Sequence, residues 1–195
     1  MSRERKKRKL KPRIFFFVEG KTEKVFFDAL SQEYRLLAAR TIKIMDNSGK
    51  DWVDKAANMM RNNPSLQPDR NTKIFIIFDK DDLTETDIAK MKKKSEKLGK
   101  QCLDCKLGIS NLSFEVWLLA HFQSITNRIE NQMHLNAQLS GYLNADYVKG
   151  NSRQMETIVK DDKVYVAIEN ASNVSMFSVD RQSTNIGDIV AEVIN

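Results

Sequence analysis

The sequence has few of the residues that staple small folds or cross membranes. It has two cysteines and two histidines in 195 residues, too few for a disulfide framework and poorly spaced for a zinc finger. Seven glycines and three prolines exclude a collagen-like repeat. The longest apolar runs, Ile14 to Val18 and Ile74 to Phe78, fall far short of the roughly 20 residues that span a bilayer. The first run ends at Glu19, so we expect no secretory signal and a cytoplasmic protein without a membrane partner.

Positive charge is concentrated at the N-terminus. The chain has 32 Lys and Arg against 26 Asp and Glu, a formal net charge of +6. Residues 1–13 hold eight of these bases and one acid, so the rest of the chain is close to neutral. This segment is predicted to be a flexible basic tail. Such a tail can neutralise phosphates, with Arg5, Lys6, Lys7 and Arg8 as candidate nucleic-acid contacts, or it can be a solvated end.

The first two thirds of the chain alternate between strand and helix patterns. The predicted strands are Ile14 to Val18, Thr41 to Met45, Ile74 to Phe78, and an edge-like strand from Cys102 to Ile109. Continuous apolar strands are typical of sheets buried on both faces. Helices are predicted between them, capped by Ser48, by Thr84 and by Ser110-Asn111. We therefore expect a mainly parallel α/β domain over residues 14–125, flanked by helices.

The C-terminal third has a different composition. After Thr126, Asn, Gln and Ser become frequent and strand patterns stop. Helices are predicted from Asn127 to Leu139, from Ser152 to Ala171 and around Ile186 to Val193. Residues 126–195 are therefore expected to form a helical extension packed on the α/β core.

Carboxylates follow two of the predicted strands directly. Glu19 comes after the first strand, and Asp79, Asp81 and Asp82 come after the third. In a parallel sheet these positions share the carboxyl edge, where ligands bind. Carboxylate oxygens with water and phosphate oxygens suit Mg²⁺, and Mn²⁺ is the alternative ion. The spacing predicts a divalent-metal site containing Glu19, Asp79, Asp81 and Asp82.

The turn after the first predicted strand partly matches a nucleotide-binding motif. Gly20-Lys21-Thr22 has the letters that end a P-loop, but position 15, where that motif needs glycine, is Phe15. We therefore do not expect nucleotide hydrolysis of the P-loop type. Gly20 is interpreted as the tight turn that presents Glu19. Glu23 is either a metal residue or an acid favoured at a helix N-terminus.

An apolar helix is predicted from Phe114 to Phe122, interrupted by Glu115 and His121. A charged residue in such a helix needs a partner or an exposed edge. We expect Glu115 to face the metal site and His121 to be a packing residue. Cys102 and Cys105, three residues apart on a strand, should point to opposite faces as buried thiols.

Five segments carry a family resemblance. Val18-Glu19-Gly20-Lys21-Thr22-Glu23 and Phe78-Asp79-Lys80-Asp81-Asp82 resemble the Glu and Asp-x-Asp signatures of a Toprim domain. The block from Ser110 to Phe122, with its Phe-Glu-x-Trp-Leu-Leu-x-His-Phe pattern, resembles the RloB-like family, also called AbiLii. Tyr147-x-Lys149 and Ser183-Thr184-Asn185 are similar to its C-terminal features. No glycine shortly follows Asp81, so topoisomerase and primase activities are not expected.

The resemblance implies a Toprim-like, metal-dependent nuclease acting in phage defence, through abortive infection or alongside restriction systems. It also implies a partner ATPase or another defence protein. The substrate would be DNA or RNA, tRNA included. Independently of the resemblance, the acids suit phosphoryl chemistry. Asp79 and Asp81 would hold the metal at the scissile phosphate, and Glu19 would move a proton or complete the metal site. Lys21 and Lys80 are candidate phosphate contacts.

Two other functions compete with the nuclease hypothesis. One is a non-catalytic subunit that binds nucleic acid or a partner in a defence complex. The other is a phosphoacceptor receiver, which is disfavoured because no lone acceptor Asp and later strand-end Lys are evident. Oligomeric state does not follow from the sequence.

Overall fold

The computed structural model describes residues 12–36, 40–45 and 50–195. The strands are β1 (Arg13–Val18), β2 (Arg40–Ile44), β3 (Thr72–Asp79), β4 (Asp104–Asn111) and β5 (Ser183–Thr184). The α-helices are α1 (Lys21–Glu33), α2 (Trp52–Asn62), α3 (Glu85–Gly99), α4 (Glu115–Ala120), α5 (Gln132–Leu143), α6 (Ser152–Val159), α7 (Lys163–Ala171) and α8 (Ile186–Ile194). Short 3₁₀ helices occupy Pro64–Leu66 and Ser172–Val174. The tail residues Arg5, Lys6, Lys7 and Arg8, and the predicted cap Ser48, lie outside the described residues.

The five strands form one sheet in the order β2-β1-β3-β4-β5. The first four are parallel, and β5 is antiparallel to β4. The expected mainly parallel α/β sheet is therefore confirmed. Because β1 and β3 are neighbours, with Val18 opposite Ile77, their carboxyl ends and the acids that follow lie at one edge.

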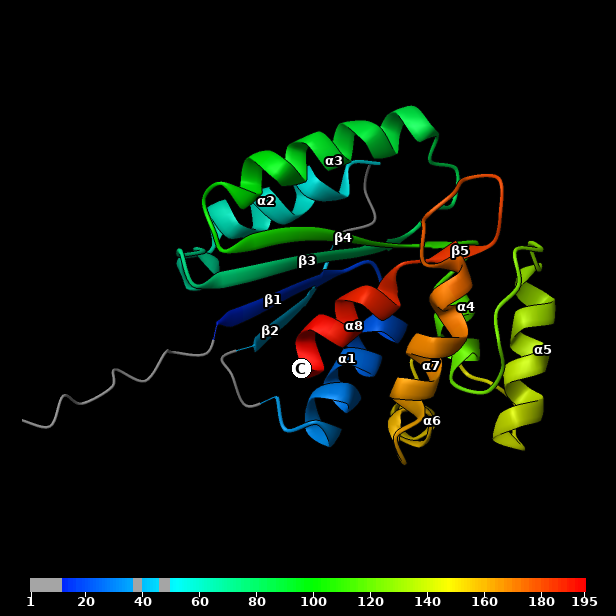
Figure 1. The fold of residues 1–195 in the computed structure, drawn as a ribbon. Coiled ribbons are helices and arrows are strands. Elements are labelled where there is room, and N and C mark those ends of the chain that lie inside the picture. Colours follow the sequence, from blue (N-terminus) through cyan, green and yellow to red (C-terminus); the bar gives the residue numbers. More distant parts are fainter. Residues whose placement is uncertain (1–11, 37–39, 46–49) are drawn as a thin grey trace, which may run out of the picture.

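Helices cover both faces of the sheet (Figure 1). α2 and α3 lie on one face, and α1 with the helices from α4 onward lies on the other. Alternate side chains of β1 belong to the two different faces of the sheet. Phe15 and Phe17 pack with α2 and α3. Phe16 and Val18 pack with α1 and the C-terminal helices. This arrangement explains why β1 is apolar from Ile14 to Val18, since neither face meets water there.

The N-terminal caps of α3 and α2 can be compared with the caps predicted from the sequence. Thr84 and Asp87 form a capping box at the start of α3, which confirms the predicted cap. At α2, Asp51 is the N-cap and accepts a hydrogen bond from the Asp54 amide at 3.0 Å, whereas the predicted cap Ser48 lies outside the described residues.

Strand β4 begins and ends two residues later than expected, and it is more central in the sheet. Ser110 and Asn111 belong to β4 and pair with β5, so they do not cap the following helix, and α4 begins only at Glu115. β4 is not an edge strand at its carboxyl end because β5 covers it there. Cys102 precedes the strand, and both cysteines are free and pack in the same cluster. The expectation of opposite faces is therefore wrong.

The C-terminal region contributes to the sheet as well as to the helical layer. The single helix predicted from Ser152 to Ala171 is two helices, because Asp161 and Asp162 adopt left-handed φ values of 58° and 59°. α5 begins at Gln132 rather than Asn127. β5 corrects the expectation that strands stop after Thr126. In the described part of the chain, no helix is long and apolar enough to cross a membrane.

Candidate active site

Glu19 and Asp79 are held together at the carboxyl edge of the sheet. The Glu19 amide donates to the Ile77 carbonyl at 3.0 Å, which continues the ladder one residue past β1. The Asp79 amide donates to Glu19 Oε2 at 2.8 Å. Two acids 60 positions apart in sequence are thus fixed next to each other by main-chain geometry.

A cavity of about 260 Å³ opens on one side of this pair. Asp81 and Asp82, both exposed, line it together with Glu19 and Asp79. Asp81 adopts a left-handed φ of 40°, a conformation that Asp tolerates better than most residues and that is frequent at functional sites. The cavity is also lined by Lys50, Trp52 and Leu83.

A second cavity of about 290 Å³ shares Glu19 and Asp79 in its lining. Glu23 and Glu115 bring two further carboxylates to it, and the remaining lining residues are Gly20, Lys21, Thr22, Phe114 and Lys149. The predicted acids therefore divide into two groups: Asp81 and Asp82 on one side, Glu23 and Glu115 on the other. Glu19 and Asp79 belong to both.

Burial and mutual repulsion raise the pKa values of the acids in the centre. Burial raises the pKa of Asp79 well above its usual range, and the charges of Glu23 and Glu19 raise it further. Burial also raises the pKa of Glu19, against the opposing effect of the hydrogen bond from Asp79. For Glu23, burial is again the largest cause and lifts the pKa to about 7. A cation among these carboxylates would relieve this repulsion.

Glu115 has a different environment. Its side chain is 1% exposed, yet Lys149 Nζ lies 3.3 Å from Oε1 and the Tyr147 hydroxyl donates to the same oxygen at 3.0 Å. Burial alone would raise the pKa of Glu115, but the charge of Lys149 and the hydrogen bond from Tyr147 act against it, and the pKa is lowered. Glu115 is therefore an ionised, partnered carboxylate at the second cavity.

Two glycines shape this region. Gly20 has φ −137°, which other residues also adopt, so the turn itself does not require glycine. A Cβ on Gly20 would stand 3.1 Å from Glu23 Oε2, so glycine leaves room for that carboxylate. At position 150, by contrast, the left-handed φ of 68° favours glycine over any residue with a side chain. It packs on the side chain of Lys21, where a Cβ would lie 2.9 Å from Cγ.

Of the two lysines predicted to contact phosphate, only Lys21 lines one of the two cavities. Lys21 lines the second cavity, whereas Lys80 Nζ donates to the Asp81 carbonyl at 3.2 Å and lines neither cavity. Sequence reasoning missed Lys50 and Trp52 as lining residues, and it gave Lys149 no role. Only the family-like Tyr147-x-Lys149 pattern marked this last position in advance.

The donor types suit a hard divalent cation, but the side chains do not converge on one point. Among the described residues, no three Asp, Glu, His or Cys side chains stand close enough to hold an ion together. Mg²⁺ requires only one or two protein carboxylates, because waters and substrate phosphates complete its shell. Glu19, Asp79 and Asp81 at one cavity meet that smaller requirement.

Comparison with known proteins places the chain in a family. No curated protein and no solved structure matches it. A family model described as RloB-like protein matches residues 14–193. This range contains β1 from its second residue, the other four strands, both cavity-lining groups of acids and the Tyr147-Lys149 pair. The chain belongs to the RloB-like family.

Proposed function

We propose that this chain is a Toprim-like phosphodiesterase that cleaves nucleic acid with Mg²⁺ or Mn²⁺. The observation that carries the proposal is the Glu19–Asp79 pair, joined by the 2.8 Å hydrogen bond at the carboxyl edge of a parallel sheet, with Asp81 lining the same cavity. Its setting in phage defence, with a partner ATPase or another defence protein, is part of the same proposal and rests on the family resemblance.

In this proposal each residue has a task set by its position. Asp79 and Asp81 would hold the divalent ion, with Asp82 and Glu23 as further oxygen donors at the two cavities. When bound, the ion would neutralise charge on the scissile phosphate and acidify a water. Glu19 uses Oε2 to accept the Asp79 amide, which leaves Oε1 to take a proton from the attacking water. Lys50 and Lys21 offer positive charge to phosphate oxygens, one at each cavity.

The test uses the purified full-length chain with plasmid DNA, single-stranded DNA or total tRNA, each in Mg²⁺, Mn²⁺ or EDTA. We expect cleavage of at least one substrate that EDTA stops. Asp79→Ala and Asp79→Asn should abolish it without unfolding the chain, because removing a repelled carboxylate does not weaken the fold. Asp28→Asn, at a half-buried position of α1 that lines neither cavity, is the matched control and should retain activity. Full activity and metal affinity in the Asp79 variants would overturn the assignment.

A non-catalytic role in nucleic-acid or partner binding is the second candidate. It is favoured by the spread of the acids, since no three of the described metal-binding side chains stand close enough to share an ion. It predicts binding without cleavage in every metal, and equal binding by the chain and its Asp79→Asn variant. The cleavage assay therefore separates the two candidates.

A further inference from the structure

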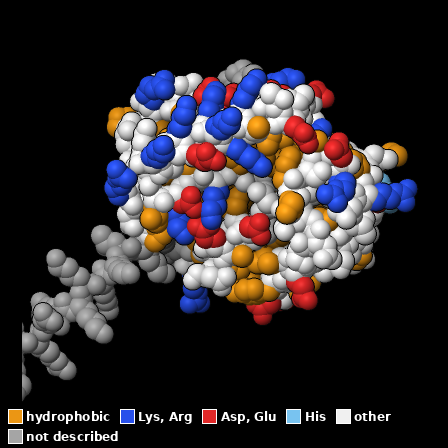
Figure 2. All heavy atoms as spheres, turned by 45° about the horizontal axis from the view of Figure 1, so that its top comes forward, with side chains coloured by type: hydrophobic (Ala, Val, Ile, Leu, Met, Phe, Trp, Pro, Cys, Tyr) orange, Lys and Arg blue, Asp and Glu red, His pale blue; other side chains and the backbone are white. Residues whose placement is uncertain are grey.

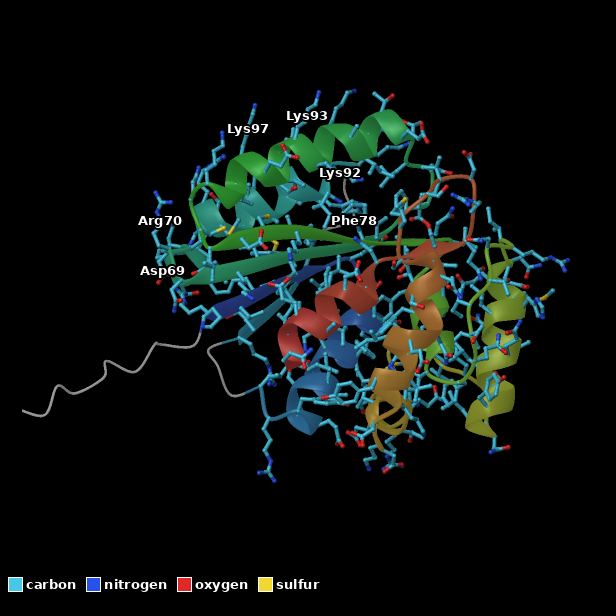
Figure 3. The ribbon with its side chains drawn as sticks, in the orientation of Figure 1. Asp69, Arg70, Phe78, Lys92, Lys93 and Lys97 are labelled. Atoms are coloured by element: carbon cyan, nitrogen blue, oxygen red, sulfur yellow. The ribbon has the colours of Figure 1, made fainter. Side chains whose placement is uncertain are left out.

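The outer side of α3 carries a row of lysines. Between residues 90 and 100 the chain has six lysines and one acid, Glu96. Lys90, Lys93, Lys97 and Lys100 recur at helical spacing, so they form one stripe, and all four are exposed. Figure 3 shows Lys93 and Lys97 pointing away from the sheet. At 1.5 Å per residue the stripe is about 15 Å long.

None of the four stripe lysines forms an ion pair with an acid in the described part of the chain, whereas several other lysines do. Lys24, Lys73 and Lys106 form ion pairs at 2.5 to 2.7 Å. On α3 itself, Lys94 lies 2.6 Å from both Asp51 and Asp54 of the α2 region. Within the described ranges no acid lies within ion-pair distance of the four stripe lysines, Glu96 on the same helix included. Like charges at this spacing repel along a helix, and an external polyanion would remove that cost.

The stripe extends from the candidate active site toward the opposite end of the sheet. At its first end, the hydrogen bonds with Thr84 lower the pKa of Asp87 in the first turn of α3, and the charges of Lys90 and Lys50 lower it further. Lys50 also lines the acidic cavity. At its other end, Arg70 Nη1 donates to the Lys100 carbonyl at 3.0 Å. Figure 3 shows this span, with Arg70 at one end of the sheet and Phe78, which precedes Asp79, toward the other.

The positive charge is a feature of this side of the molecule. Figure 2, with the α2–α3 side turned toward the viewer, shows Lys and Arg side chains gathered over its upper part. The acids of α2 do not neutralise the stripe, because Asp51 and Asp54 are occupied by Lys94. The surface is elongated and positive along one helix, which matches a charged polymer better than a compact anion.

We infer that the outer face of α3, with Lys90, Lys93, Lys97 and Lys100, binds the phosphate backbone of a nucleic acid. The inference deepens the proposed function: the strand runs along α3 and reaches the cavity of Glu19 and Asp79 at the Lys50 end. Backbone contacts of this kind position a nucleic acid without reading its sequence. DNA and RNA share the recognised group, so the experiment includes both.

The test is equilibrium binding of the full-length chain to a duplex DNA and to an RNA hairpin, in EDTA so that no cleavage intervenes. The variant is Lys93→Glu/Lys97→Glu, which preserves helix propensity because Lys and Glu rank alike. The matched control is Arg153→Glu/Lys160→Glu, which makes the same change in charge at exposed positions of the α6 region, on the other face of the sheet (Figure 1). Thermal unfolding of each variant checks that it is folded.

The stripe variant should bind at least one of the two nucleic acids about tenfold or more weakly than the control does. The slope of log affinity against log salt should fall by about 2, one unit for each lost phosphate contact. Equal affinity and slope in the stripe variant and the control would overturn the inference. So would binding to phosphatidylserine vesicles but to neither nucleic acid.

The result is separable from the outcome of the cleavage test. Loss of binding in the stripe variant, in a chain that cleaves nothing, would support the surface and sink the proposed nuclease. If the stripe variant cleaves and binds nucleic acid as well as the unchanged chain does, the proposed nuclease is supported and the stripe surface is contradicted.

Discussion

At the scale of single residues, Glu19 is the point on which the proposed chemistry depends. One oxygen is engaged by the Asp79 amide at 2.8 Å, and the side chain lines both acidic cavities. A helix N-terminal acid without chemistry would contribute well under ~1 kcal/mol of stability and nothing to turnover. The two roles therefore predict different consequences of replacing it.

Glu19→Gln should slow cleavage by about 10²–10⁴-fold while nucleic-acid binding persists. The amide retains the shape and can still accept the hydrogen bond, but it cannot take a proton from water. Binding need not weaken, because a negative charge near the phosphate is removed. Single-turnover cleavage and equilibrium binding measure the two effects. Glu33→Gln, at the exposed end of α1, is the control, and near-normal cleavage by Glu19→Gln would reduce Glu19 to a helix-end acid.

Tyr147→Phe should destabilise the fold by about 1.5–3 kcal/mol, because it removes a hydrogen bond to the buried, ionised Glu115. The Tyr147 hydroxyl lies 3.0 Å from Glu115 Oε1. The control is Tyr142→Phe, whose hydroxyl donates at 2.9 Å to the neutral side chain of Gln123 near the surface. Urea unfolding should show a clearly smaller loss there. Equal losses would mean that Lys149 alone holds the Glu115 charge.

At the scale of elements, α4 is notable for being buried on all sides. Every residue from Glu115 to Ala120 is buried, and His121 follows at 3% exposure. His121 Nδ1 donates to the Trp117 carbonyl at 3.1 Å, while Nε2 has no hydrogen-bond partner among the described residues. Its expected packing role is confirmed. Burial lowers the pKa of His121 from 6.5 to about 4.

The buried His121 at the end of α4 should make the free energy of unfolding fall in mild acid. The unfolded chain takes up the His121 proton at its ordinary pKa, whereas the folded chain does so only near 4, so stability is lost as pH falls below about 6.5. Between about pH 7 and pH 5 the loss from this group is about 2 kcal/mol. His121→Leu should remove that part of the pH dependence. Urea unfolding of both proteins at each pH gives the difference, and parallel pH profiles would contradict a buried neutral imidazole.

At the scale of the whole molecule, the basic N-terminus joins the fold at β1. Arg13 is the first residue of that strand, and its guanidinium donates to the Gln67 and Ser65 carbonyls at 3.2 Å. Residues 1–11 lie outside the described part of the chain. A deletion that tests the tail should therefore stop before Pro12, so that Arg13 remains.

Deletion of residues 1–11 should weaken nucleic-acid binding and make its salt dependence shallower, because seven bases and one acid are removed. Cleavage at low salt should survive, since the acids of the cavities are untouched. Binding titrations over a range of salt provide the measurement. Arg13→Ala is the contrast: it should lower thermal stability with a much smaller change in the salt slope. An unchanged salt slope after the deletion would make the tail a solubilising end.

The parallel sheet and the placement of the first acids could be predicted because they are local properties of the sequence. Apolar runs define β1 and β3 without reference to distant residues, since a doubly covered strand has no polar face. The acids directly after these runs must then leave at the carboxyl edge. Thr84 and Asp87 likewise form their capping box within one helical turn.

Other features depend on contacts between distant segments. The partners of Glu115 come from Tyr147 and Lys149, about 30 positions away, and no periodicity links them. β5 is two residues long, too short to have a pattern, and forms only because β4 offers it a free edge. Lys50 lines the acidic cavity although it is about 30 positions from both Glu19 and Asp79 in the sequence.

The sequence by itself therefore determined the class of the sheet, the edge that carries Glu19, Asp79 and Asp81, and the basic character of the N-terminus. Strand period and charge are fixed by neighbouring residues, so they survive without a fold. Only the tertiary structure decided that the acids line two cavities, that Glu115 pairs with Lys149, and that the four stripe lysines lie outside ion-pair distance of every described acid. These properties depend on which surfaces meet, and burial and ion pairing have no values until the chain has packed.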